Sequence, residues 1–141
     1  MQKGLEYIGV GSGAIIQNAE GKYFLSKRGK KAKNERGTWE FPGGGVEFGD
    51  TMEQTIIREF KEEYGADIEV IQLFDAYDHL IPDEKQHWIA ISFICEIVNG
   101  TPQILEPEKC DAIGWYSFAE MEKMPLSLAT QYEVMKLKNQ G

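Results

Sequence analysis

Acidic side chains are concentrated near the middle of the sequence, at spacings that suit metal chemistry. If positions 50 to 64 form a helix, Glu59, Glu62 and Glu63 fall within roughly 100° of arc. Glu47, in the loop before them, can be aimed at the same point. Carboxylates at helical neighbour spacing repel one another unless a cation lies between them. The stretch therefore predicts a binding site for a divalent ion that could engage a phosphate.

The predicted helix must also pack against the rest of the protein. Ile56, Ile57, Phe60 and Tyr64 occupy the stripe that adjoins the acidic edge. A stripe of this kind is typical of an amphipathic helix on the surface of a globular protein. We expect one edge of the helix to carry the acids and the next to enter the core.

The same residues resemble the Nudix box, whose pattern is G-x5-E-x7-R-E-U-x-E-E-x-G-U, where U is apolar. Gly44 matches the opening glycine, and residues 58 to 66 match the second half position by position. The family has Glu where this chain has Asp50, which is one methylene shorter and a better helix cap. We therefore expect Asp50 to serve the structural part of that role.

The resemblance implies a hydrolase of phosphate anhydrides that uses Mg²⁺, with Mn²⁺ as the alternative ion. Magnesium prefers oxygen ligands and bridges protein carboxylates to substrate phosphates. Of the helix acids, Glu62 or Glu63 would also orient or deprotonate the attacking water. The implied metal ligands are Glu59, Glu62 and Glu63, completed by Glu47 and the backbone carbonyl of Gly43 or Gly44.

Arg58 is grouped with the catalytic residues, although both of its interpretations are structural. It is spaced to pair with Glu62 at i,i+4 on the helix. By resemblance it would instead orient the catalytic loop through Glu47 or the loop carbonyls.

Two further regions could contact a polyphosphate. A second acid from a later loop is common in the family, and Glu106 and Glu108 are the candidates. Arg28 at the end of a predicted strand is a candidate phosphate ligand, because similar proteins have Arg there, and the alternative is a solvated cation.

Residues 106 to 111 and Trp115, together with the box, resemble the MutT-type branch of small Nudix nucleoside-triphosphate pyrophosphatases. This likeness implies hydrolysis of a nucleoside triphosphate, standard or oxidised, to a monophosphate and pyrophosphate. Aromatic residues on strands usually pack in the core, so contact with the base is the less common alternative for the candidates. These candidates are Tyr77, His79, His87 and Trp88.

Two other functions remain open. Nudix hydrolases of ADP-ribose and other nucleoside-diphosphate derivatives often carry a proline about fifteen residues beyond the box, near Pro82, although this proline also suits a turn. A Nudix module that binds a ligand without catalysis is expected to lose metal-ligand positions, whereas the helix acids are all present here.

The glycines outside the box motif do not predict other nucleotide-binding loops. No Lys-Ser or Lys-Thr pair follows residues 43 to 45, so a phosphate loop is not indicated. Residues 9 to 14 resemble a dinucleotide fingerprint but lead into Ile15, Ile16 and a turn, where a helix would be required. Small residues on a strand are the better interpretation.

With 141 residues, the chain should form a single Nudix domain over residues 1–141. The net charge of −8 argues against nucleic-acid polymers and anionic membranes as partners. Without a long apolar run or a basic-then-apolar leader, we expect a soluble, cytoplasmic protein. Cys95 and Cys110 are interpreted as reduced thiols in or near the core, with a disulfide as the alternative. A homodimer is compatible with the resemblance.

The predicted elements alternate between strand and helix, which indicates an α/β fold, and the resemblance implies an α/β/α sandwich with a mixed sheet. Strands at 7–16 and 22–27 should form a hairpin around the turn at 18–21. The box helix should begin near Asp50 or Thr51, with Glu53 or Gln54 as its capping-box partner. The remaining strands are predicted at 39–41, 67–77, 87–97 and 112–116, a turn at 99–100, a loop at 28–36, and helices from 117 and over 127–137.

Overall fold

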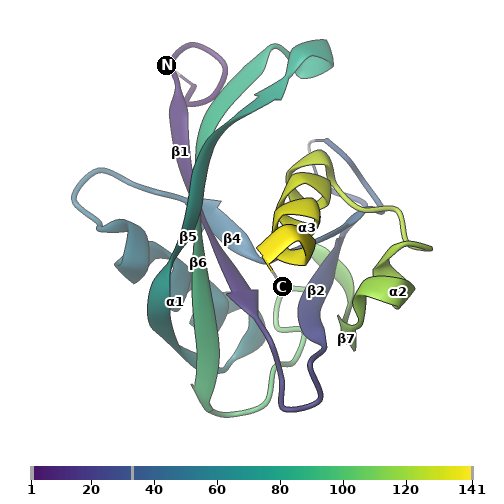
Figure 1. The fold of residues 1–141 in the computed structure, drawn as a ribbon. Helices are drawn as coiled ribbons and strands as arrows, with labels where there is room; N and C mark the ends of the chain where they lie inside the picture. The colour runs from purple at the N-terminus through teal and green to yellow at the C-terminus, as the bar shows by residue number, and fades with distance from the viewer. Residues whose placement is uncertain (1, 33, 141) are drawn as a thin grey trace. The chain divides into compact units, whose positions relative to one another are not determined.

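The computed structural model describes residues 2–32 and 34–140 (Figure 1). The chain divides into two compact units. The first, which we call the box unit, contains the residues up to 16 and those from 42 to 105. The second unit contains residues 17 to 41 and those from 106 onward.

The box unit is built on a four-stranded mixed sheet in the order β4-β1-β6-β5. Strand β1 runs parallel to β6 and antiparallel to β4, and β5 and β6 form a long antiparallel hairpin. Helix α1 packs against β1, β4 and β5. The elements of this unit are β1 (Gly9–Ile16), β4 (Gly43–Gly45), α1 (Met52–Tyr64), β5 (Asp67–Ile81), the 3₁₀ turn η1 (Pro82–Glu84) and β6 (Gln86–Asn99).

Helix α1 has a well-defined start and end. Thr51 is its N-cap and forms a capping box with Gln54, so the predicted start at Thr51 is confirmed and Asp50 is not the cap. Gly65 ends the helix with φ 75°, a left-handed conformation that glycine adopts without a steric penalty. Ile56, Phe60 and Tyr64 are buried, which confirms that this part of the apolar stripe enters the core, whereas Ile57 is exposed and its predicted place in the core is wrong.

The second unit contains a three-stranded antiparallel sheet in the order β3-β2-β7 and two helices. Aromatic pairs support it, including Tyr23 stacked on Phe118 at 5.2 Å and Phe24 edge-on to Trp115 at 5.4 Å between ring centroids. Its elements are β2 (Tyr23–Arg28), β3 (Trp39–Glu40), β7 (Cys110–Tyr116), α2 (Phe118–Met121) and α3 (Leu128–Gln140). With the mixed sheet of the box unit, these elements confirm the predicted α/β class.

One strand pairing differs from the prediction. The turn at residues 18–21 is present, with the Asn18 side chain accepting from the backbone N–H groups of Glu20 and Lys22. The strands on either side of it, however, belong to different sheets, so the predicted hairpin of 7–16 with 22–27 is wrong. A local turn signal shows where the chain reverses but not which strand it will pair with.

The three glycines after Pro42 form a strand, β4, which the sequence did not predict. Gly44 lies opposite Ser12 of β1. A Cβ atom added at Gly43 would lie only 2.5 Å from the carbonyl oxygen of Ser12, so the two backbones approach too closely for a side chain. The close approach explains why glycine is needed at Gly43.

Both cysteines are free and buried, which confirms their interpretation as reduced thiols. Burial, together with the negative charge of Glu53, raises the pKa of Cys95 to about 12. This thiol therefore stays protonated at neutral pH. Among the helices of residues 2–32 and 34–140, none has the length and apolar character needed to cross a membrane.

Candidate active site

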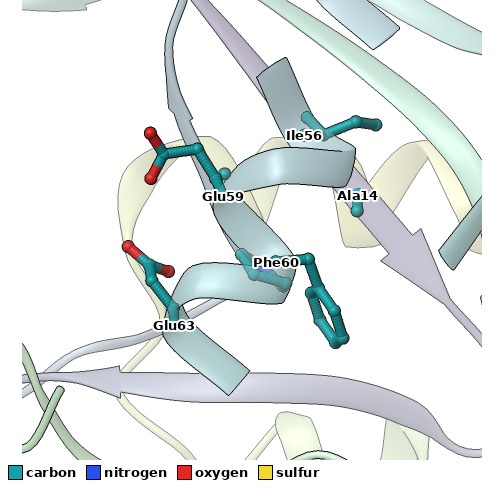
Figure 2. Close-up of a pocket in the computed structure, with 7 residues that line it drawn as sticks. Ala14, Ile56, Glu59, Phe60 and Glu63 are labelled. Carbon is teal, nitrogen blue, oxygen red and sulfur yellow. The ribbon is translucent and has the colours of Figure 1, made fainter. Parts of the chain in front are cut away.

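Two of the helix acids lie on the same side of α1. Figure 2 shows the carboxylates of Glu59 and Glu63 pointing in the same direction, while Ile56 and Phe60 point away from them into the unit. The separation follows from helical periodicity, which places i and i+4 on one face. These side chains border a narrow hollow, which is lined by Ala14, Pro42, Gly43, Ile56, Glu59, Phe60 and Glu63.

The glycine strand lies directly against one of these carboxylates. A Cβ atom added at Gly44 would be 2.7 Å from Cγ and 2.9 Å from Cδ of Glu59. The hydroxyl of Ser12 on β1 donates to the carbonyl oxygen of Met52, at 2.9 Å, which ties the sheet to the first turn of α1. The backbone of β4 and the side chain of Glu59 are therefore held in contact within the box unit.

Arg58 pairs mainly with a residue that neither sequence interpretation named. Its NH1 group donates to Oδ2 of Asp50 at 2.5 Å, whereas its contacts with Glu59 and Glu62 are longer, at 3.8 and 3.9 Å. The hydrogen bond with Asp50 raises the pKa of Arg58 further above its ordinary value. Asp50 and Arg58 thus connect the loop before α1 to the middle of the helix.

Glu47 is exposed and is paired with a lysine from the start of the chain. The distance from Nζ of Lys3 to Oε2 of Glu47 is 3.0 Å, and the same amine donates to the carbonyl oxygen of Val46 at 3.0 Å. Sequence reasoning missed Lys3. No local pattern relates it to Glu47, because the contact depends on how the N-terminal residues pack.

The carboxylate and backbone carbonyl oxygens near the glycine strand suit a hard cation. Carboxylate and backbone carbonyl oxygens are the ligands that Mg²⁺ prefers, and such sites usually take one or two carboxylates together with substrate phosphates and waters. Within residues 2–32 and 34–140, no three acidic, histidine or cysteine side chains are gathered as a ready metal cluster. Glu59 beside Gly44 nevertheless provides a place where a carboxylate and the glycine strand meet, so the residues fit an ion that substrate helps to hold. The assignments of Glu47, Glu59, Glu62, Glu63, Gly43 and Gly44 as ligands stay predictions.

Arg28 is not a solvated cation. Its Nε donates to the carbonyl oxygen of Asn34 at 3.0 Å, NH2 donates to Oδ1 of Asn34 at 2.9 Å, and NH1 donates to the Glu40 carboxylate at 3.1 Å. Burial raises the pKa of Glu40, and the nearby charge of Arg28 opposes that rise. Arg28 therefore holds the loop between β2 and β3, and its predicted phosphate contact remains a prediction.

The predicted second-loop acids lie in the second unit near the end of β2. The backbone N–H of Gly29 donates to the carbonyl oxygen of Lys109 at 3.0 Å, which joins the two loops. Lys109 also pairs with Glu106 at 3.6 Å, while Glu108 is exposed. The structure brings Arg28 and this segment into one region, and the roles of Glu106 and Glu108 stay predictions.

The four candidate base contacts divide into two groups. Trp88 packs so tightly on the N-terminal backbone that a Cβ atom at Gly4 or at Gly9 would lie 2.5 Å from its indole ring. His87 is paired with Asp78, at 2.8 Å between Nε2 and Oδ1. Both therefore have structural contacts, and a contact with the base stays a prediction for these two as well as for Tyr77 and His79 on β5.

A NUDIX domain family model matches residues 8–137, which covers most of both units. The chain belongs to the Nudix family. This membership and the box on α1 confirm the resemblance drawn from the sequence.

Curated relatives carry hydrolase names. The chain is 29% identical over 124 residues to an 8-oxo-dGTP diphosphatase of Escherichia coli, covering 88% of this chain and 92% of that protein. It is 37% identical over 85 residues to an ADP-ribose pyrophosphatase of Methanocaldococcus jannaschii, covering 60% of this chain and 49% of that protein. A nudix hydrolase of Caenorhabditis elegans is 29% identical over 96 residues, 68% of this chain. The chain spans about half the length of the archaeal relative and only 25% of the nematode one.

A solved structure of a MutT NUDIX hydrolase from Burkholderia pseudomallei is similar over nearly its whole length. Its TM-score is 0.84 at 32% identity, with 92% of this chain and 98% of that chain covered. The similarity confirms the predicted Nudix fold and the likeness to the MutT branch.

Proposed function

We propose that this protein is a metal-dependent pyrophosphohydrolase that cleaves a nucleoside triphosphate to the monophosphate and pyrophosphate. The observation that supports this most directly is the contact between Gly44 of β4 and Glu59 of α1, beside a second carboxylate, Glu63, on the same side of the helix. The proposed substrate follows the E. coli relative, which covers almost the entire chain.

In the proposed reaction, one water molecule is consumed and one phosphate anhydride bond is broken. Glu59, Glu62, Glu63 and Glu47 would hold Mg²⁺, or Mn²⁺ as the alternative, with the carbonyl groups of the glycine strand beside them. Such an ion, when bound, lowers the pKa of a bound water and offsets the charge on the leaving phosphate. Glu62 orients the water and accepts its proton.

Arg58 acts in this proposal as a positioning residue. Its bond to Asp50 keeps the end of the loop close to the middle of the helix, so that the loop and the acids keep one geometry. A charge-assisted hydrogen bond of this kind is stronger than one between neutral groups.

The test is product analysis in magnesium buffer. The protein is incubated with normal and oxidised nucleoside triphosphates in ¹⁸O-labelled water, and products are followed by chromatography and mass spectrometry. We expect a monophosphate and pyrophosphate, with Glu62→Gln slowing turnover by about 10²-fold or more, since a positioned base contributes that much. Glu53→Gln, an exposed acid in the first turn of α1, is the matched control and should retain activity. Unchanged turnover in Glu62→Gln would refute the assignment.

Hydrolysis of ADP-ribose is the second candidate, because the archaeal relative with that activity in its name is 37% identical over the region it shares. Pro82 does not add support, since it opens the 3₁₀ turn η1 between β5 and β6 and so has a structural role. ADP-ribose is therefore included in the same panel. Release of AMP and ribose phosphate at a higher kcat/KM than any triphosphate would favour this candidate.

A further inference from the structure

The residues before β1 form a turn that is docked on the start of β6. The backbone N–H of His87 donates to the carbonyl oxygen of Gly4 at 2.8 Å, and Gly4 itself has φ 84°. The indole of Trp88 lies against Gly4 and Gly9 with no room for a Cβ atom at either position. The turn is thus held both by the hairpin and by its own backbone hydrogen bonds, such as the one from the N–H of Gly4 to the carbonyl oxygen of Tyr7 at 2.6 Å.

This docked turn delivers one positive charge to the loop before the box helix. Nζ of Lys3 lies 3.0 Å from both the carbonyl oxygen of Val46 and Oε2 of Glu47. The Lys3 side chain is 23% exposed, whereas that of Glu47 is 66% exposed. The ammonium group is therefore partly enclosed, while the carboxylate it pairs with remains open to a dissolved ion.

The loop backbone has other attachments and does not depend on Lys3 alone. The backbone N–H of Val46 donates to the carbonyl oxygen of Val10 at 2.8 Å, and that of Asp50 donates to the carbonyl oxygen of Glu47 at 3.0 Å. Gly45 is paired with Gly11 across β4 and β1. What Lys3 adds to these bonds is chiefly its charge.

We propose that Lys3 is an internal counter-ion for Glu47, which competes with the divalent ion for this carboxylate and so weakens metal binding at the box. The inference rests on the proposed function, in which Glu47 is one of the metal ligands. A cation bound to Glu47 has to share or displace the ammonium group, and like charges at that separation repel. The lysine thus keeps the exposed carboxylate neutralised until an ion, helped by substrate phosphate, replaces it.

The test measures Mn²⁺ binding directly, by the loss of the free-ion signal in electron paramagnetic resonance, without turnover. Lys3→Met removes the charge but keeps a long side chain, and we expect Mn²⁺ to bind about two- to five-fold more tightly, as the strength of an exposed ion pair allows. Lys3→Arg keeps the charge and should match the wild type. Lys138→Met is the control for net charge, since Lys138 pairs with Glu122 at 2.9 Å in the second unit, and it should also match the wild type.

A double-mutant cycle assigns the effect to the pair. In a Glu47→Gln background, Lys3→Met should no longer change Mn²⁺ affinity. Weaker or unchanged binding in Lys3→Met, or the same gain in the Glu47→Gln background, would overturn the inference while leaving metal-dependent hydrolysis intact. Absence of Mn²⁺ binding by the wild type, even with a non-hydrolysable triphosphate analogue present, would overturn both the proposed function and this inference. Thermal unfolding of each variant verifies that it is folded.

Discussion

At the scale of single residues, the candidate site depends on short contacts that leave no spare volume. Gly44 has no side chain, so Glu59 can lie against the backbone of β4. The Asp50 carboxylate reaches Arg58 although it is one methylene shorter than the glutamate of the family motif. Although Asp50 departs from the motif, it therefore still provides a partner for Arg58.

The Gly44 contact predicts a defect that is specific to function. In Gly44→Ala, the new methyl group would lie 2.7 Å from Cγ of Glu59, so the carboxylate must move. Because a flexible side chain can move at small cost, we expect the free energy of unfolding to change by less than about 1 kcal/mol, while kcat/KM falls by about ten-fold or more. Denaturant unfolding and steady-state kinetics measure the two effects.

Gly11→Ala is the matched control for that substitution. Gly11 lies on the neighbouring strand β1, and a Cβ atom there would have its nearest neighbour at 3.9 Å. Normal activity is expected. Equal losses of kcat/KM in Gly44→Ala and Gly11→Ala would show that both substitutions act by disturbing the strands and not through Glu59.

At the scale of elements, the side chain of Arg28 connects the loop between β2 and β3 to strand β3. Arg28 joins Asn34 in the loop to Glu40 on β3, with side chains that are 25% exposed for Arg28 and 27% for Glu40. Removing the arginine would leave a largely buried carboxylate without its counter-charge. The cost of that change depends on the protonation state of Glu40.

Arg28→Met should therefore destabilise the protein in a pH-dependent way. Burial holds the pKa of Glu40 in the folded protein above its ordinary value of 4.5, so the folded state binds this proton more strongly than the unfolded state does. The free energy of unfolding therefore falls as the pH rises from 4.5 through the folded pKa. Loss of Arg28 removes the opposing charge and raises this pKa further. Urea unfolding should show a loss of about 1–3 kcal/mol at neutral pH, which shrinks toward about pH 5.

Two controls isolate the ion pair. Arg36→Met removes another arginine of the same loop, one that is exposed and donates to the carbonyl oxygen of Ala32, and its effect should be small. In Arg28→Met combined with Glu40→Gln, the pH dependence should disappear. A loss in Arg28→Met that is equal at both pH values would contradict the account.

At the scale of the whole molecule, charge limits how a polyphosphate can be bound. The chain has a net charge of −8, so its field opposes an anionic ligand. Arg28 and Arg58 already donate to carboxylates of the protein. Binding of a nucleotide is therefore expected to rely on the metal ion.

Metal removal tests this dependence. Calorimetric titration with a non-hydrolysable triphosphate analogue should give an affinity at least about ten-fold weaker in chelator than in magnesium buffer of the same ionic strength. Matching the ionic strength separates coordination from general screening. Equal affinity in the two buffers would mean that side chains of the protein bind the phosphates directly.

Local patterns predict the box helix, its N-terminal capping box, most strands and the family, because each depends on neighbours within a few residues or on a motif with many fixed positions. Thr51 with Gln54, Gly65 and the apolar stripe are local signals of this kind. Three features became visible only in the folded chain: β1 and β2 enter different sheets, Arg58 pairs with Asp50, and Lys3 reaches Glu47. These outcomes depend on which distant segments pack together, and the energy of such contacts is set by burial and geometry that no local pattern encodes.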